Sequence, residues 1–113
     1  MAEGNEPRPV SVYFDNPTLL YDFSGTVETT VNLSTPANKF KFIIYRLKDN
    51  NNDAVNVLTL PYNLARNSYY RFYGKDSSTW GSVGMSPDGT QLTCNRTAST
   101  TNGINIYGYG EIN

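Results

Sequence analysis

The segment between positions 69 and 80 carries the side chains of this chain that are best suited to hold a ligand. Side chains of an extended strand alternate between its faces, so Tyr69, Arg71 and Tyr73 share one face. An arginine among tyrosines favours this face as the exposed one and leaves Tyr70 and Phe72 facing the core. Sugars present apolar C–H surfaces beside hydroxyl groups, which match planar aromatic rings with polar neighbours. The alternative is that these rings only pack across strands and cover the sheet. The candidate ligand-binding residues are Tyr69, Arg71, Tyr73, Asp76 and Trp80.

A second aromatic pair lies near the end of the chain. Tyr107 and Tyr109 fall on one face of an extended segment, and Gly108 and Gly110 fall on the other. Glycine inside a strand marks a bulge or a close approach by another part of the backbone. We interpret Tyr107 and Tyr109 as a candidate oligomer contact. The alternative is a twisted terminal strand with no partner.

The run of acidic and amide residues at 49–53 has the oxygen spacing that begins a calcium loop. Asp49, Asn51 and Asp53 occupy the first, third and fifth positions of that pattern. However, Ala54 stands where the loop requires glycine, and Leu60 stands where it requires the bidentate glutamate. We therefore expect a solvated hairpin loop and no metal site.

The composition excludes several classes of enzyme. The chain has no histidine, so triads that depend on an imidazole base and His-ligated metal sites are excluded. Its single cysteine, Cys94, alternates with polar neighbours and is predicted to be buried. A pair of carboxylates for glycoside hydrolysis would remain possible, but no such motif is found. We predict a protein that is not an enzyme and uses no cofactor. The carboxylates that could contribute to such a pair are Asp22, Glu28, Asp76, Asp88 and Glu111.

The overall charge and hydropathy pattern limit the partners. Nine Lys and Arg against ten Asp and Glu give a formal net charge of -1, so no basic field attracts nucleic acid. The longest apolar run, 42–45, is far shorter than the about 20 residues that span a bilayer. The first ten residues lack the basic and apolar regions of a signal peptide. We expect a protein made in the cytoplasm, or a fragment, without nucleic-acid binding or membrane insertion.

Short alternating segments separated by turn residues predict β-strands along the whole chain. Residues 1–9 are a polar lead-in or linker, and residues 10–113 are predicted to form a single domain. We predict an all-β fold, an antiparallel two-layer β-sandwich of jelly-roll-like type with about eight or nine short strands. The predicted strands are 10–14, 18–23, 26–33, 39–47, 54–60, 68–74, 80–85, 91–96 and 104–112.

Alternation within these strands also predicts which side chains fill the core between the two layers. The predicted inward residues are Val12, Leu20, Val31, Leu33, Phe42, Ile44, Val57, Leu60, Phe72, Val83, Leu92, Ile104 and Ile106.

Four stretches carry a resemblance to a known group of proteins. They are Leu19 to Gly25, Val31 to Ser34, Phe40 to Asn50 and Ile104 to Gly108. In this order the chain resembles the small C-terminal β-sandwich modules of phage tail-fibre, tail-tip and related minor structural proteins. The resemblance implies a virion-associated module that contacts a host surface glycan or protein receptor and other virion subunits. It also implies a homotrimer or another homo-oligomer.

Two other functions agree with the same sequence. One is a capsid decoration or head-fibre protein with a purely structural role, which requires a self-complementary apolar patch and no sugar site. The other is a carbohydrate-binding module from a larger bacterial enzyme. Selective binding to glycans would separate the first of these from an attachment module.

Overall fold

The computed structural model describes residues 17–97 and 101–112. The lead-in at 1–9, the predicted strand at 10–14 and the core candidate Val12 lie outside the described residues. None of the helices in the described part is long and apolar enough to span a bilayer.

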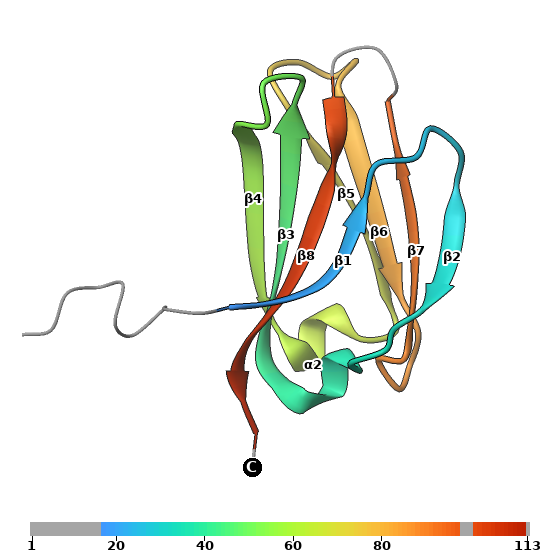
Figure 1. Cartoon of the computed structure of the whole chain (residues 1–113), viewed down its shortest axis with the longest axis vertical. Coiled ribbons are helices and arrows are strands. Elements are labelled where there is room, and N and C mark those ends of the chain that lie inside the picture. Colours follow the sequence, from blue (N-terminus) through green and yellow to red (C-terminus); the bar gives the residue numbers. More distant parts are fainter. Residues whose placement is uncertain (1–16, 98–100, 113) are drawn as a thin grey trace, which may run out of the picture.

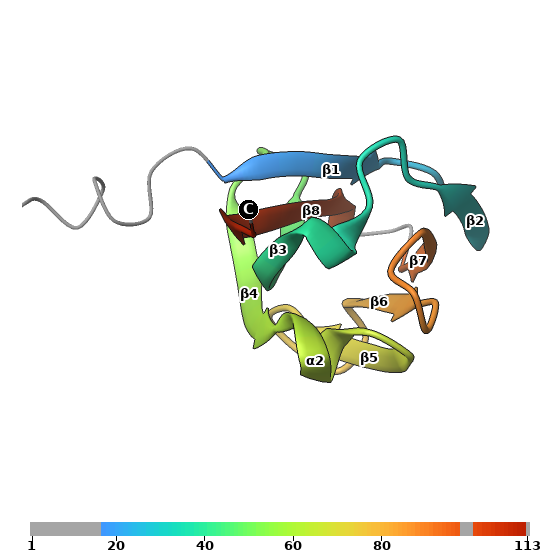
Figure 2. The ribbon, with the colours of Figure 1, turned by 90° about the horizontal axis from the view of Figure 1, so that it is seen from below.

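The described chain folds into two antiparallel four-stranded sheets (Figure 1). The elements are β1 (Thr18–Phe23), β2 (Thr29–Asn32), η2 (Ala37–Lys39), β3 (Phe40–Asp49), β4 (Ala54–Pro61), α2 (Tyr62–Ala65), β5 (Ser68–Tyr73), β6 (Trp80–Met85), β7 (Gln91–Arg96) and β8 (Thr101–Glu111). The first sheet has the strand order β1-β8-β3-β4, and the second has the order β2-β7-β6-β5. Figure 2 shows the two sheets as facing layers. The predicted all-β sandwich is confirmed.

The turn between β6 and β7 illustrates how local sequence determines the strand pairing. Gly89 has a φ of 73°, a conformation that residues with a Cβ rarely adopt, and its N–H donates to the Ser86 carbonyl at 3.1 Å. The carboxylate of Asp88 accepts hydrogen bonds from Ser86 Oγ at 2.9 Å and from Thr90 Oγ1 at 2.7 Å. These bonds close the turn that the sequence Ser-Pro-Asp-Gly predicted, and they set the register of β7 against β6.

The core fills the space between the sheets, and both layers contribute to it. The predicted inward residues Leu20, Leu60, Phe72, Val83, Leu92, Ile104 and Ile106 are buried. Val31 and Leu33, at and just beyond the end of the edge strand β2, are half-buried and pack against the core.

Three core predictions were wrong, and all three concern the hairpin of β3 and β4. Phe42, Ile44 and Val57 were predicted to face inward, but they lie on the outer face of their sheet. The buried residues of β3 are instead Ile43, Tyr45 and Leu47. Both alternating sets of this segment mix apolar and charged residues, with Lys41 in the set of Ile43 and Arg46 in the set of Ile44, so alternation alone could not choose between them. The pairing of Tyr45 with Ile106 on β8 decides the orientation.

The hydroxyl of Tyr45 is buried without a hydrogen-bond partner among the described residues. The ring stacks on Phe72 with centroids 6.3 Å apart, and burial raises the pKa of the phenol. An unpaired buried hydroxyl costs about 1–3 kcal/mol. We therefore expect Tyr45→Phe to raise the free energy of unfolding by about 1 kcal/mol in urea denaturation.

A matched control for Tyr45→Phe is Tyr70→Phe. The Tyr70 hydroxyl donates to the Leu64 carbonyl at 2.8 Å, so its loss is expected to lower stability by about 1 kcal/mol. Destabilisation by Tyr45→Phe would show that the hydroxyl has a favourable partner.

Cys94 is fully buried, as predicted, and burial raises the pKa of its thiol from 9.0 to about 12. Above pH 9 the unfolded chain releases this proton while the folded chain keeps it, so stability present at neutral pH is lost as the pH rises toward 12. We expect the free energy of unfolding to fall by about 1 kcal/mol per pH unit from this group. Urea denaturation between pH 8 and pH 10 measures this slope, which Cys94→Ala is expected to reduce. Equal slopes in both proteins would contradict the assignment.

Candidate ligand-binding face

Strand β5 presents its tyrosines on the outer surface of the second sheet. Tyr69 and Tyr73 are 58% and 45% exposed, and Arg71 between them is also exposed. Phe72 is buried and Tyr70 packs against the core. The predicted division of β5 into an outer and an inner face is confirmed, and the ligand-binding role of the outer residues stays a prediction.

Arg71 links the aromatic side chains of this surface. Its guanidinium lies 4.1 Å from the ring centroid of the half-buried Trp80, which is cation–π geometry. Hydrogen bonds from the buried Ser82 and then from Arg71 lower the pKa of Tyr69. The same contact with Tyr69 raises the pKa of Arg71. Arg71 therefore contacts both an indole and a phenol on this surface.

Asp76 belongs to the β5–β6 turn rather than to the aromatic surface. Its carboxylate accepts hydrogen bonds from Ser78 N at 2.9 Å and from Ser78 Oγ at 2.6 Å. These two bonds lower the pKa of Asp76. Oδ1 of Asp76 thus has a structural role within its own turn, and the role of the exposed Asp76 in ligand binding stays a prediction.

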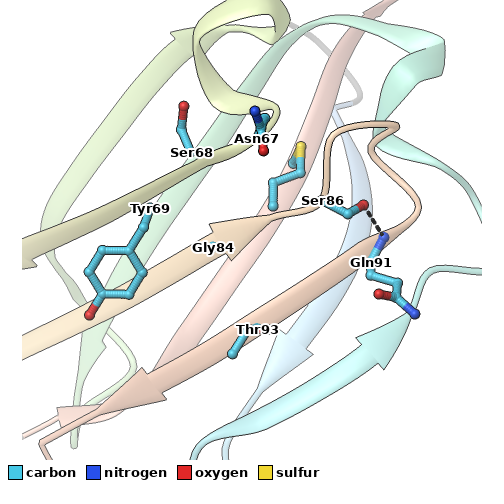
Figure 3. Close-up of a pocket in the computed structure, with 8 residues that line it drawn as sticks. Asn67, Ser68, Tyr69, Gly84, Ser86, Gln91 and Thr93 are labelled. Carbon is cyan, nitrogen blue, oxygen red and sulfur yellow. Dashed lines mark hydrogen bonds between the residues drawn. The ribbon is translucent and has the colours of Figure 1, made fainter.

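An open groove of about 430 Å³ runs beside Tyr69 across the same surface (Figure 3). Gly84 pairs with Tyr69 on one side and with Thr93 on the other, so the floor of the groove carries no side chain. Tyr69 stands on the β5 side of the groove, and Thr93 and Gln91 stand on the β7 side (Figure 3). The groove is lined by Asn67, Ser68, Tyr69, Gly84, Met85, Ser86, Gln91 and Thr93.

The β7 side of the groove is formed by hydroxyl and amide groups. Thr93 Oγ1 lies 2.8 Å from Thr30 Oγ1, and Gln91 Nε2 donates to Asn32 Oδ1 at 2.8 Å. These pairs orient the side chains but leave hydrogen-bonding capacity on the Gln91 amide and on the hydroxyls. We call the outer residues of β5, β6 and β7 the tyrosine face, which comprises Tyr69, Arg71, Tyr73, Trp80, Gly84, Gln91 and Thr93.

Sequence reasoning missed the polar half of the tyrosine face. The alternation of Gln91 and Thr93 with the buried Leu92 and Cys94 was a usable signal for their exposure. Their position opposite Tyr69 was not readable, because it depends on the register of three strands.

Tyr107 and Tyr109 lie on the outer surface of the other sheet. Tyr109 packs beside Phe42 with centroids 6.1 Å apart, and Tyr107 pairs with Ile44 of β3. Gly108 faces the core, where the Phe40 ring takes the place that a side chain would occupy. The close approach at this glycine is thus made by a side chain and not by another backbone segment, and the role of Tyr107 and Tyr109 in oligomer contact stays a prediction.

The loop at 49–53 is a hydrogen-bonded turn. Asp49 Oδ1 accepts from the N–H of Asn51 at 2.9 Å and from that of Asp53 at 3.0 Å. Within the described residues, no group of three His, Cys, Asp or Glu side chains is placed to hold a metal ion.

The carboxylates Asp22 and Asp88 also have partners within the chain. Asp22 forms an ion pair with Lys48 at 3.3 Å, and Asp88 caps the β6–β7 turn.

Comparison of the chain with family models, curated proteins and solved structures finds no match.

Proposed function

We propose that this chain is a non-enzymatic virion module that attaches to a glycan on the host surface through the tyrosine face. The observation that carries the proposal is the groove with an exposed tyrosine on one side, hydroxyl and amide groups on the other, and glycine at its floor. A module of a tail fibre or tail tip is the context that the resemblance of the sequence implies.

The chemistry of the groove suits a sugar ring. The apolar C–H surface of a pyranose packs on the Tyr69 ring, and its hydroxyls exchange hydrogen bonds with Gln91 and Thr93. The groove is shallow and open, so we expect an affinity near 1 mM for a single site, equivalent to about 4 kcal/mol. Repeated copies on one particle raise the effective affinity because later binding events become intramolecular.

A glycan array of the purified protein tests this proposal. Wild-type protein is expected to bind a restricted set of glycans, and Gly84→Leu is expected to abolish that binding by filling the groove floor. A Cβ at position 84 would meet nothing nearer than 3.6 Å, so the variant is expected to fold. Asn50→Leu, which adds the same side chain at an exposed turn away from the groove, is the control.

Two results would contradict the proposal. One is the absence of any selective glycan binding by a multivalent display of the wild-type protein. The other is unchanged binding by a folded Gly84→Leu variant, with folding verified by circular dichroism.

A further inference from the structure

The outer surface of the sheet β1-β8-β3-β4 is an extended apolar surface. The strand register aligns Leu19, Tyr107 and Ile44 in one row across three strands. Tyr109 and Phe42 form the next row, in which their rings are in contact. We call this surface the apolar face, and its members are Leu19, Phe42, Ile44, Tyr107 and Tyr109, with Val57 at its border opposite Arg46.

No described element covers the apolar face. Leu19, Phe42 and Val57 are 51%, 37% and 50% exposed. The second sheet packs on the opposite side, and η2 and α2 lie at one end of the sandwich (Figures 1 and 2). Contiguous apolar surface of this kind marks an interaction site in a folded protein.

A polar row borders the apolar face, and its charges are paired within the chain. Arg46 Nη1 donates to Asn105 Oδ1 at 2.9 Å, and Asn105 Nδ2 donates to Asp22 Oδ1 at 2.9 Å. Lys48 adds an ion pair to Asp22 at 3.3 Å. This row attracts no strongly charged partner, and the side chains beside it are mostly apolar, with the hydroxyls of Tyr107, Tyr109 and Thr59 among them. The chemistry therefore favours another apolar protein surface.

The whole outer surface of the sheet β1-β8-β3-β4 is close in size to what a second copy of this chain would cover. Four strands about 4.8 Å apart and about 30 Å long give roughly 600 Å² of projected surface. A standard protein interface buries about 800 Å² on each partner, and two sheets pack face to face at about 10 Å. The outer surface of the sheet, with the apolar face within it, thus approaches the area that a standard interface requires.

The order of the rows is self-complementary under one particular two-fold rotation. Along β3 the rows follow in the order Phe42 with Tyr109, then Ile44 with Tyr107, then Arg46 with Asn105. A two-fold axis in the interface, perpendicular to the strands at the middle row, reverses this order in the second copy. The row of Arg46 then lies over the partner's row of Phe42 and Tyr109. A guanidinium over aromatic rings is a favourable cation–π contact. An axis along the strands would place Arg46 near its own copy, which like-charge repulsion disfavours.

We propose that a second copy of this chain docks on the apolar face, with the sheets packed face to face and the strands of the two copies running in opposite directions. This inference does not depend on glycan binding. It does imply that the two tyrosine faces of a pair point away from each other, because each lies on the far side of its own sandwich.

Sedimentation equilibrium of the full chain tests the pairing. At concentrations up to about 100 μM, above the range from μM to pM in which interfaces of standard size bind, the wild-type protein is expected to have twice the monomer mass. Leu19→Asp and Val57→Asp place charges at exposed positions of the apolar face and are expected to give monomers. Tyr69→Asp places the same charge at an exposed position of the opposite sheet and is expected to remain a dimer.

The pairing is overturned by a wild-type monomer at these concentrations, by a trimer, or by a dimer that survives both Leu19→Asp and Val57→Asp. It is also overturned if Tyr69→Asp dissociates the dimer while circular dichroism shows that the variant is folded. Glycan binding by a monomer would leave the proposed function standing while refuting the pairing.

Discussion

Gly108→Ala is expected to lower the free energy of unfolding by about 3 kcal/mol, the upper range for overpacking a core. A Cβ at this position would overlap Cγ and Cδ2 of the Phe40 ring. Phe40 is buried at the start of β3, and these ring atoms lie close to its backbone, so the ring cannot swing away without moving the strand. Urea denaturation of the two proteins measures the difference.

Gly84→Ala is the matched control for Gly108→Ala. Both glycines lie inside strands, but a Cβ at position 84 meets the Tyr69 ring at an ordinary 3.6 Å. Replacing glycine by alanine in a strand removes unfolded-state entropy, so this variant is expected to be as stable as the wild type or more stable by about 0.5 kcal/mol. Equal destabilisation by the two substitutions would mean that Phe40 does not occupy the space above Gly108.

Tyr69→Ala is expected to weaken glycan binding by about tenfold to a hundredfold, since a central aromatic contact contributes about 1–3 kcal/mol. The substitution removes the ring that stands on the β5 side of the groove and leaves the polar side intact. The side chain is 58% exposed, so stability is expected to change little. Isothermal titration calorimetry with the glycan that binds best on the array measures the loss.

Tyr69→Phe separates stacking from hydrogen bonding. It keeps the ring but removes the hydroxyl that interacts with Ser82 and Arg71. We expect a loss of no more than about threefold, because packing of the ring face supplies most of the contact. A Tyr69→Ala variant with wild-type affinity would exclude the ring from the binding site.

The solvent-facing side of β5 was predictable because it carries a charged side chain. Burying the charged guanidinium of Arg71 would cost much more free energy than burying the ring of Tyr69 or Tyr73. The position of Arg71 therefore fixes which face of β5 points to solvent. The turn at 86–89 was predictable for a similarly local reason, since glycine tolerates the positive φ found at Gly89.

The orientation of β3 could not be predicted because its two alternating sets each contain a charged residue, Lys41 in one and Arg46 in the other. Phe42 and Ile44 look like core residues in the sequence, and they are apolar because they form part of the apolar face. The pairing proposed above would cover these outward-facing apolar side chains. The turn around Asp76 has a local cause, because Ser78, two residues later, donates two hydrogen bonds to Asp76 Oδ1.

The groove lies beyond local sequence reasoning altogether. Tyr69, Gly84 and Thr93 meet only through the pairing of β5 with β6 and of β6 with β7. In the sequence, Gly84 indicates only a low propensity of its segment to form a strand. In the fold, Gly84 lies at the floor of the groove and leaves it without a side chain.

The most direct test of the central claim is an NMR titration of ¹⁵N-labelled protein with the preferred glycan from the array. Saturable shifts of the backbone amides of Tyr69, Gly84 and Thr93, with Ile44 and Tyr107 unaffected, are the predicted result. Shifts that cluster on the sheet β1-β8-β3-β4, or the absence of any saturable shift, would contradict glycan binding at the tyrosine face.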